Sequence, residues 1–463
     1  LSFYSCESWL NVTPSDRLSE EMLFNDREGF VKALNGVYIE LNTNELYGRN
    51  LTAGALDVMG QYYSVASSSH AFYNYGGLVY TGNDEKALFD NMWQKCYAVI
   101  ACCNTIIEKC DENKAGLSPV WRGSIKGEAL ALRAMLHFDM LRLFGPLTSE
   151  LDKESIPYQT NSDQTVTPLL SGSEVVGLIL DDLKNAVGLL KDTDPYFVEE
   201  EFSDTDLNYR RFRMNYFAAK GLMARVQLWG GDKEKAAATA KEVIAEGQAE
   251  GAEFFPFVTN SEATSSNPDR VFYSEVLFGT YHSSREKLHE DLFAPTLEST
   301  SILTLAGTAR RDDLYDNEND YRYSVWSTYN KNGTSVLYHR KFEKQDNVTA
   351  SRQYMIPLIR MSEMYLIAVE CCKLDEASVY LNTFRNARNC NSLALTEDNR
   401  INILANEYKK EMLGEGQLFF FYKRQEMVNI SDGNQATGTK NVELAKYVVP
   451  LPESETDQRI SST

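Results

Sequence analysis

Apolar residues recur at steps of three and four along much of the chain, which is the spacing of one face of an α-helix. The clearest case lies between the pair Ser118–Pro119 and the pair Gly145–Pro146. A serine side chain caps free amides at a helix start, proline fits the first helical position, and glycine followed by proline ends a helix. Two apolar stripes run side by side between these signals. The sequence therefore predicts a long central helix that is covered on more than one side.

The same spacing predicts a mainly α-helical fold. Two of the helices, at residues 216–230 and 233–247, are joined by a Gly-Gly-Asp turn and carry small residues where they would touch, as tetratricopeptide hairpins do. We therefore expect a framework of tetratricopeptide-like helical hairpins. The other predicted helices lie at residues 28–41, 85–110, 174–191, 361–372 and 375–389.

Two segments lack a helical period. Residues 42–83 are rich in Gly, Ser, Asn and Tyr, and residues 251–350 are punctuated by Pro and Gly, with short strand-like pieces such as 271–279. Twelve of the 26 tyrosines lie within 62–80 and 273–338. We expect one domain over residues 23–463, with a helical framework at 23–250 and 351–463 and a loop-rich, short-strand insertion at 251–350 that carries the binding surface.

The composition argues against several classes of function. The chain has 46 Lys plus Arg against 66 Asp plus Glu, and its net charge of −20 argues against nucleic acid and anionic membrane surfaces as partners. Three cysteines, Cys96, Cys103 and Cys110, lie on an apolar helical stripe, where a thiol acts as a small hydrophobic group. The eight cysteines and five histidines show no zinc-ligand spacing, so we expect no metal site and no cofactor.

Five sequence blocks resemble the SusD/RagB family, the surface nutrient-binding lipoproteins of the Bacteroidetes. They follow the family's order and span most of the chain. They read GEALALRAMLHFDMLRLFGPL at 127–147, PLIRMSEMYLIAVE at 357–370, LNTFRNARN at 381–389, NEYKKEMLGEGQLFFFYKR at 406–424, where the family has one helix, and VPLPESE at 449–455.

The resemblance implies a lid-like protein outside the outer membrane that sits on a SusC-like TonB-dependent transporter. Family members capture oligosaccharides, or peptides in some cases. The N-terminal LSFYSC then resembles the end of a lipoprotein signal, with Cys6 as the lipid-bearing residue and residues 1–22 as the tether. The expected location is the cell surface, anchored to the outer membrane by lipid.

Two other classes of function, an enzyme and a protein-binding scaffold, compete with nutrient binding. Glutamates at 363, 370, 407, 411 and 415 invite a glycosidase interpretation, but they follow helix faces at steps of four or seven, as solvated or Arg-paired charges do. Neither a phosphate loop nor a catalytic triad motif is present, so no catalytic residue is expected. A helical-repeat scaffold that binds only proteins stays possible.

A sugar site needs amphipathic aromatic rings with polar partners around them. We expect it where residues 61–80 and 273–338 meet on the framework, with Trp326 as the main stacking residue because its polar neighbours give no reason for burial. The alternative is that the tyrosines only pack the loops onto helices. Further stacking candidates are Tyr73, Tyr75, Tyr281, Tyr323 and Tyr329, and the hydrogen-bonding candidates are Asp57, Asn74 and Arg322.

Overall fold

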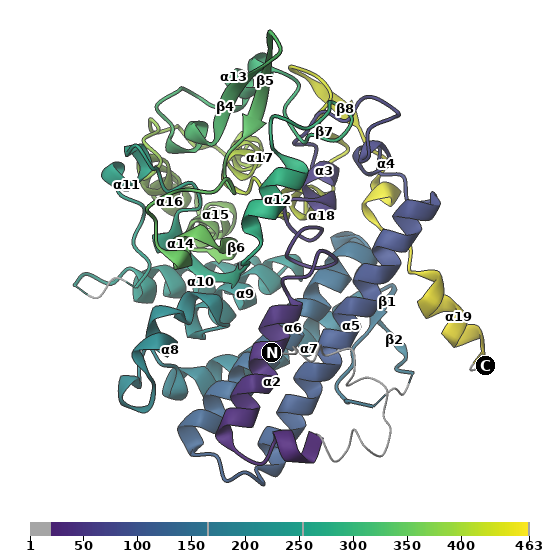
Figure 1. Ribbon diagram of the computed structural model, residues 1–463, viewed down its shortest axis with the longest axis vertical. Helices are drawn as coiled ribbons and strands as arrows, with labels where there is room; N and C mark the ends of the chain where they lie inside the picture. The colour runs from purple at the N-terminus through teal and green to yellow at the C-terminus, as the bar shows by residue number, and fades with distance from the viewer. Residues whose placement is uncertain (1–19, 164–165, 252–253, 462–463) are drawn as a thin grey trace.

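The computed structural model describes residues 20–163, 166–251 and 254–461, and its elements are mainly helical (Figure 1). The main helices are α2 (Arg27–Glu40), α5 (Asn83–Glu112), α6 (Pro119–Phe144), α7 (Gly172–Thr193), α9 (Tyr216–Trp229), α10 (Lys233–Gly247), α15 (Met361–Cys371), α16 (Leu374–Asn386), α17 (Arg400–Glu411), α18 (Gln417–Arg424) and α19 (Glu453–Ser461). The shorter helices are α3 (Ala55–Met59), α4 (Tyr73–Gly76), α8 (Asp204–Asn208), α11 (Asn260–Thr264), α12 (Arg285–Leu292), α13 (Thr308–Leu314) and α14 (Ala350–Gln353).

The strands form four antiparallel pairs, which are β1 (Glu154–Pro157) with β2 (Leu169–Ser171), β3 (Val276–Tyr281) with β6 (Met355–Arg360), β4 (Trp326–Lys331) with β5 (Thr334–His339), and β7 (Asn429–Ser431) with β8 (Thr439–Asn441). In the part of the chain that the structure describes, no helix is both long and apolar enough to cross a bilayer.

Helix α6 is the centre of the framework, as the sequence predicts. Ser118 Oγ accepts the amide of Trp121 at 3.3 Å, and Pro119 occupies the first turn. Every residue from Gly127 to Phe144 is buried, because α2, α5, α7 and α9 pack around the helix. The ammonium of Lys423 donates to the carbonyl of Gly145 at 2.7 Å, so a buried lysine from α18 caps the C-terminal end of α6.

The predicted hairpins are confirmed. Helices α9 and α10 pack on each other, and the small residues Ala224, Ala236 and Ala240 lie fully buried between them. Helix α10 also packs on α15, which pairs with α16. Hairpins from the two ends of the framework therefore join into one stack.

The block at residues 406–424 is not one helix. Helix α17 ends at Glu411 and α18 starts at Gln417, since Gly414 and Gly416 have φ of +79° and +69°. A Cβ added to Gly416 would lie 2.4 Å from the carbonyl oxygen of Leu51. Only glycine fits this close approach, so the chain turns here and meets the N-terminal segment.

The insertion at 251–350 contains more regular structure than its sequence suggests. Strand β3 pairs with β6, which continues directly into α15, so the insertion is hydrogen-bonded to the framework. A Cβ on Gly279 would lie 2.6 Å from the carbonyl oxygen of Ile356, which explains a glycine within this pair. The hairpin β4–β5 and helix α13 rise from this base to one end of the molecule, where α4 and β7–β8 also lie (Figure 1).

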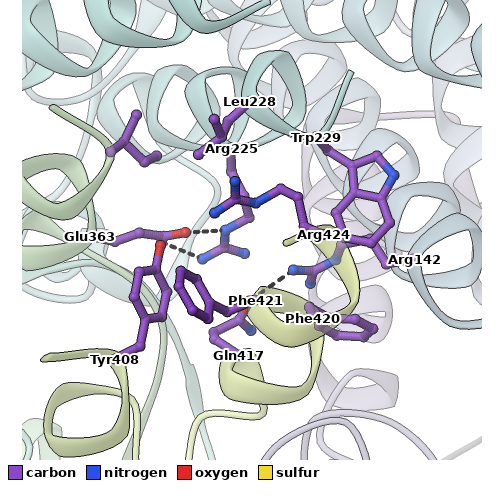
Figure 2. A pocket seen from close by; sticks show the side chains of 11 residues that line it. Arg142, Arg225, Leu228, Trp229, Glu363, Tyr408, Gln417, Phe420, Phe421 and Arg424 are labelled. Atoms are coloured by element: carbon purple, nitrogen blue, oxygen red, sulfur yellow. Dashed lines mark hydrogen bonds and ion pairs between the residues drawn. The ribbon is translucent and has the colours of Figure 1, made fainter. Parts of the chain in front are cut away.

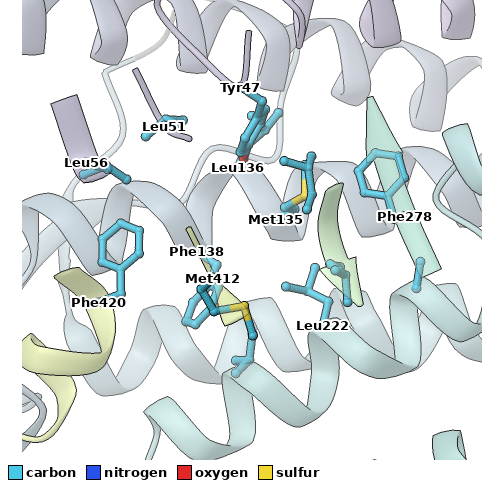
Figure 3. Packing of buried hydrophobic residues seen from close by; sticks show 14 of the residues in the cluster. Tyr47, Leu51, Leu56, Met135, Leu136, Phe138, Leu222, Phe278, Met412 and Phe420 are labelled. Carbon is cyan, nitrogen blue, oxygen red and sulfur yellow. The ribbon is translucent and has the colours of Figure 1, made fainter. Parts of the chain in front are cut away.

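The hydrophobic core joins segments from across the chain. Figure 3 shows Tyr47 and Leu56 from the N-terminal region near Phe138 of α6, with Met412 and Phe420 from the C-terminal third beside them. Buried residues from these segments belong to one contiguous cluster.

Candidate functional site

The two tyrosine-rich segments lie against each other. The amide of Ser64 donates to the carbonyl of Thr304 at 2.8 Å, and the amide of Ala71 donates to the carbonyl of Thr300 at 3.0 Å. Thr304 in turn donates its hydroxyl to the carbonyl of Leu337 in β5. The segment at 61–80, the loop at 294–305 and the hairpin β4–β5 therefore form one continuous surface.

Near its base, the hairpin has one buried face and one partly exposed face. Its loop is the pair Asn332–Gly333, with φ of +53° and +87°, which is the backbone of a type I′ turn. Strand residues alternate across the two faces, and paired residues share a face. The inner face holds Trp326, Leu337 and His339, and the outer face holds Ser327, Tyr329, Val336 and Tyr338.

The expected exposure of Trp326 is wrong. Its side chain is only 5% exposed, and Nε1 donates to the hydroxyl of Tyr315 at 3.2 Å. The indole also meets the ring of His339 edge-on at 5.2 Å. Trp326 is the first residue of β4 on the inner face, so it fills the space beneath the hairpin and presents no ring to a ligand.

Arg322 is also buried, contrary to its expected role at the surface. Its guanidinium donates to Asp320 at 2.7 Å and to Glu407 at 2.9 Å, and it lies 3.2 Å from Glu411. These carboxylates hold the pKa of Arg322 well above its usual value against the effect of burial. All of its hydrogen-bonding directions point into the protein.

Asp57 joins α3 to the turn between α17 and α18. Its carboxylate accepts the amides of Gly414 at 2.6 Å and Gly416 at 2.9 Å, and the hydroxyl of Tyr63 lies 3.3 Å away. Burial raises the pKa of Asp57 to about 7 although these amides favour the charged form. Asp57 is a structural residue here, and its oxygens do not reach the surface.

Three of the predicted tyrosines have partners inside the protein. Tyr75 is buried against the rings of Phe72 and Phe89. Tyr323 is half-buried, and its hydroxyl donates to Asp312. Half-buried Tyr281 lies apart from the hairpin, in an aromatic cluster with Tyr209, Phe212 and Tyr354.

Two predicted tyrosines are open to solvent on the shared surface. Tyr73 in α4 and Tyr329 in β4 are each 44% exposed. A segment that we call the strap, residues 296–301, is hydrogen-bonded to the chain close to each of them. Ala71 binds one end of the strap, and Lys331 donates from the hairpin to the carbonyl of Leu297 at 2.9 Å near the other.

The strap supplies polar groups to this surface. Thr296, Glu298 and Ser299 are exposed, whereas exposed Asn330 lies on the opposite face of β4 from Tyr329 and accepts the amide of Gly333 at 2.7 Å. Asn74 is half-buried next to Tyr73 and donates to Glu85 at 3.2 Å, so part of its amide is already used. The face formed by α4, the strap and the outer side of β4–β5 is called the strap face below.

Buried cavities are too small for a sugar. Figure 2 shows one inside the framework, where Arg225 pairs with Glu363 at 2.6 Å and Arg142 donates to Gln417 at 2.8 Å, with Arg424 beside them. Its volume is about 30 Å³, and a second polar cavity measures about 20 Å³. Small-molecule pockets usually measure about 300–1,000 Å³. Neither of these two cavities can therefore enclose a sugar ring.

Metal ligation has no support at the strap face. Within the described ranges, no group of three or more His, Cys, Asp or Glu side chains is arranged to hold a metal ion. The hydroxyl, amide and carboxylate groups here instead suit hydrogen bonding to a polar organic ligand.

The sequence contains one signal for this site that periodicity alone does not reveal. The pair Asn332–Gly333 between two alternating segments is a strong hairpin signal, and it assigns Trp326 and Tyr329 to opposite faces. The strap has no such signal, because its position depends on hydrogen bonds to Ala71, more than 200 positions away, and to Lys331 in the hairpin.

Comparisons with known proteins agree with this architecture. Residues 8–228 match a family model described as starch-binding and associating with the outer membrane, and residues 267–459 match the model of the SusD family. The SusD-like protein P2 of Formosa agariphila is 22% identical, over 98% of this chain and 95% of its own.

Solved structures share the fold. A SusD-like carbohydrate-binding protein from Bacteroides vulgatus superposes with a TM-score of 0.71 at 21% identity, over 93% of this chain and 96% of its own. A laminarin-binding SusD-like protein gives 0.66 at 17% identity, over 93% and 97%. The two family models cover the framework on both sides of the insertion and most of the insertion itself, and the chain belongs to the SusD/RagB family.

Proposed function

We propose that this protein binds oligosaccharides or polysaccharides at the cell surface through the strap face and passes them to a SusC-like TonB-dependent transporter. The observation that carries the proposal is the placement of two exposed tyrosines, Tyr73 and Tyr329, close to the hydrogen bonds that hold a polar strap. The family description as starch-binding, and the laminarin-binding member among proteins of the same fold, support a glycan over other ligands.

The chemistry of the strap face suits a sugar chain. A sugar ring has a flat C–H face that stacks on an aromatic ring and a rim of hydroxyls that need hydrogen-bond partners. Tyr73 and Tyr329 offer the rings, while Thr296, Glu298 and Ser299 offer donors and acceptors on the strap. An open face of this kind accepts a long chain, because neither end of the ligand has to be enclosed.

We infer binding without catalysis. The five glutamates at 363, 370, 407, 411 and 415 are buried, and each is paired with a buried or nearly buried cation. A glycosidase needs two carboxylates that face each other across an open cleft. Here the carboxylates serve as ion-pair partners within the framework.

The stacking prediction concerns the two exposed tyrosines. Tyr73→Ala and Tyr329→Ala should each weaken glycan binding about threefold to tenfold, because a stacked ring contributes about 0.5–1.5 kcal/mol beyond its buried area. Calorimetry with soluble starch, laminarin and other polysaccharides measures the affinity. The unfolding midpoint should stay unchanged, since both rings are exposed.

A matched control is Tyr209→Ala. Tyr209 is an exposed tyrosine at the end of α8, which lies in the half of the molecule away from the hairpin (Figure 1). Its substitution should leave the affinity unchanged. If Tyr209→Ala weakens binding and the strap-face variants do not, the glycan lies on the aromatic cluster around Tyr281. Binding of oligopeptides and of no polysaccharide would instead identify a peptide-binding member of the family.

A lipid anchor at Cys6 is part of the proposal, and Cys6 lies outside the described residues. The family description places these proteins at the outer membrane. Cys6→Ser should release the protein from the membrane fraction with an unchanged unfolding midpoint, because lipid chains supply the attachment. Cell fractionation measures this, and Cys371→Ser, at a half-buried thiol, should stay on the membrane. Continued membrane attachment of Cys6→Ser would refute the assignment.

A further inference from the structure

Arg270 is a nearly buried cation without a close carboxylate of its own. The residue is 6% exposed, and its Nε has no hydrogen-bond partner among the described residues. Its nearest ion-pair partner is Glu343 at 3.7 Å, which is beyond hydrogen-bonding distance. Glu343 already pairs with Arg340 at 2.7 Å. One carboxylate is thus shared by two guanidinium groups, and Arg270 holds the weaker contact.

Arg270 is one of the residues that line the second cavity. Its volume is about 20 Å³, and its charged wall is five cations and one carboxylate. The apolar part of the wall includes Val271, Val325 and Leu413. The charged lining residues are Arg270, Arg322, Lys341, Arg360, Lys410 and Glu411.

The other four cations of the wall are already neutralised. Arg360 lies close to Glu411 and Glu415, and Lys341 close to Glu415. Arg322 is paired with three acids, and Lys410 is paired with Glu407 and Asp316. Arg270 is therefore the cation on this wall whose charge is left in excess.

The region behind Arg270 adds positive charge. Arg285 is fully buried and, within the described ranges, donates only to the carbonyls of Arg352 and Met355 and has an unpartnered Nε. Arg352 lies 3.8 Å from Asp269. Burial and neighbouring arginines lower the pKa of Arg270 to about 10, and burial, Arg352 and Arg270 lower the pKa of Arg285 to about 9. Four arginines, at 270, 285, 340 and 352, thus share two carboxylates.

We propose that the cavity beside Arg270 binds one monoatomic anion, with chloride as the physiological ion. A water molecule could accept a hydrogen bond from Nε, but it would leave the excess charge of the buried guanidinium uncompensated. Phosphate, sulfate and carboxylates are excluded by size, since a cavity of about 20 Å³ has room for one particle about as large as a water molecule. A halide combines small size with the negative charge that this wall lacks.

The bound anion would stabilise the packing of the insertion against the framework. Arg270 and Lys341 come from the insertion, whereas Arg360, Lys410 and Leu413 come from β6, α17 and the turn that follows α17. An ion that binds only the folded protein lowers the unfolding equilibrium constant in proportion to its concentration once its Kd is exceeded. This property is independent of glycan binding at the strap face.

The test is unfolding by urea at constant ionic strength while sodium gluconate is replaced by sodium chloride or bromide. For one site, the unfolding equilibrium constant should fall tenfold for each tenfold rise in halide above Kd. Arg270→Met should abolish this dependence. Lys344→Gln removes an exposed positive charge nearby and should keep it in full.

A second measurement does not depend on any variant folding. Crystals of the wild-type protein grown in bromide should show an anomalous peak between Arg270 and Lys341. Equal stability in gluconate and halide would overturn the proposal. So would a cavity that contains only water at high bromide, or a halide dependence that Arg270→Met leaves intact.

Discussion

Glu411→Gln is expected to remove about 3–5 kcal/mol from the free energy of unfolding, because it breaks a buried ion-pair network at its centre. The Glu411 carboxylate accepts from Arg388 at 2.7 and 3.0 Å, from Arg360, and from Arg322 at 3.2 Å. Burial alone would raise its pKa, but Arg388, Arg360 and Arg322 together hold the pKa of Glu411 well below its usual value.

Glutamine keeps the shape of the side chain and removes the charge. Three buried guanidinium groups would then lose their shared counter-ion, and a buried charge without a partner is much costlier than a lost surface contact. Domains are usually stable by only about 5–15 kcal/mol, so the loss is a large fraction of the total. Urea unfolding should show a lower midpoint with an unchanged m-value.

Glu453→Gln is the matched control for this prediction. Glu453 pairs with Lys86 at 2.7 Å, but both side chains are more than half exposed. Water replaces such a contact readily, so the midpoint should not change measurably. If Glu411→Gln behaves like Glu453→Gln, the three arginines find other partners and the network is not a main source of stability.

The helical framework could be predicted from the sequence because its helices carry their own signals. Helix α6 has a cap, a proline and a stop within one stretch, and α9–α10 has a turn between two apolar faces. These features depend on residues within a few positions of one another. Local spacing is therefore enough to find them.

The site was predicted less well because it depends on distant contacts. Arg322 was expected at the surface, but its carboxylate partners Glu407 and Glu411 lie 85 and 89 positions further along. The burial of Trp326 depends on the local register of the hairpin, which places the indole on the inner face. Tyr73 and Tyr329 were identified as candidates from tyrosine density, yet only the strap, hydrogen-bonded close to each of them, defines a common face.

Acidification from pH 6.5 to pH 5 is expected to destabilise the protein by several kcal/mol, because all five histidines are buried. His137 is the clearest case. Its Nδ1 lies 2.9 Å from the carbonyl of Arg133, so it carries the proton, and Nε2 accepts the amide of Gln159 at 2.9 Å. Protonation would break the second hydrogen bond, and burial and Arg133 lower the pKa of His137 to about 3.

The pKa values of the other four histidines are also lowered. Burial and Arg285 lower the pKa of His282 to about 4, and burial with nearby arginines lowers that of His289 to about 4 against the opposing charge of Glu343. Burial and Lys341 lower the pKa of His339 well below its usual value, and burial lowers that of His70.

The sign of the pH dependence follows from which state, folded or unfolded, binds protons at the higher pH. The folded-state pKa values lie below the unfolded value of about 6.5, so the unfolded chain gains protons as pH falls and stability is lost below about pH 6.5. Each such histidine costs about 1.4 kcal/mol per pH unit, or about 2 kcal/mol by pH 5. Asp57 acts in the opposite direction, since its folded-state pKa of about 7 lies above that of an unfolded aspartate.

Two variants separate these contributions. His137→Gln should reduce the pH dependence of the unfolding free energy by about one proton, whatever it does to stability at neutral pH. Asp57→Asn should make the loss on acidification steeper, because it removes the one group among these six that takes up a proton on folding. Urea unfolding between pH 7.5 and pH 5 at fixed chloride and ionic strength measures both slopes. If the free energy of unfolding instead stays constant down to pH 5, the histidines gain protons as readily in the folded protein as in the unfolded chain. In that case the pKa values of buried His137 and His339 are not lowered, and the prediction is wrong.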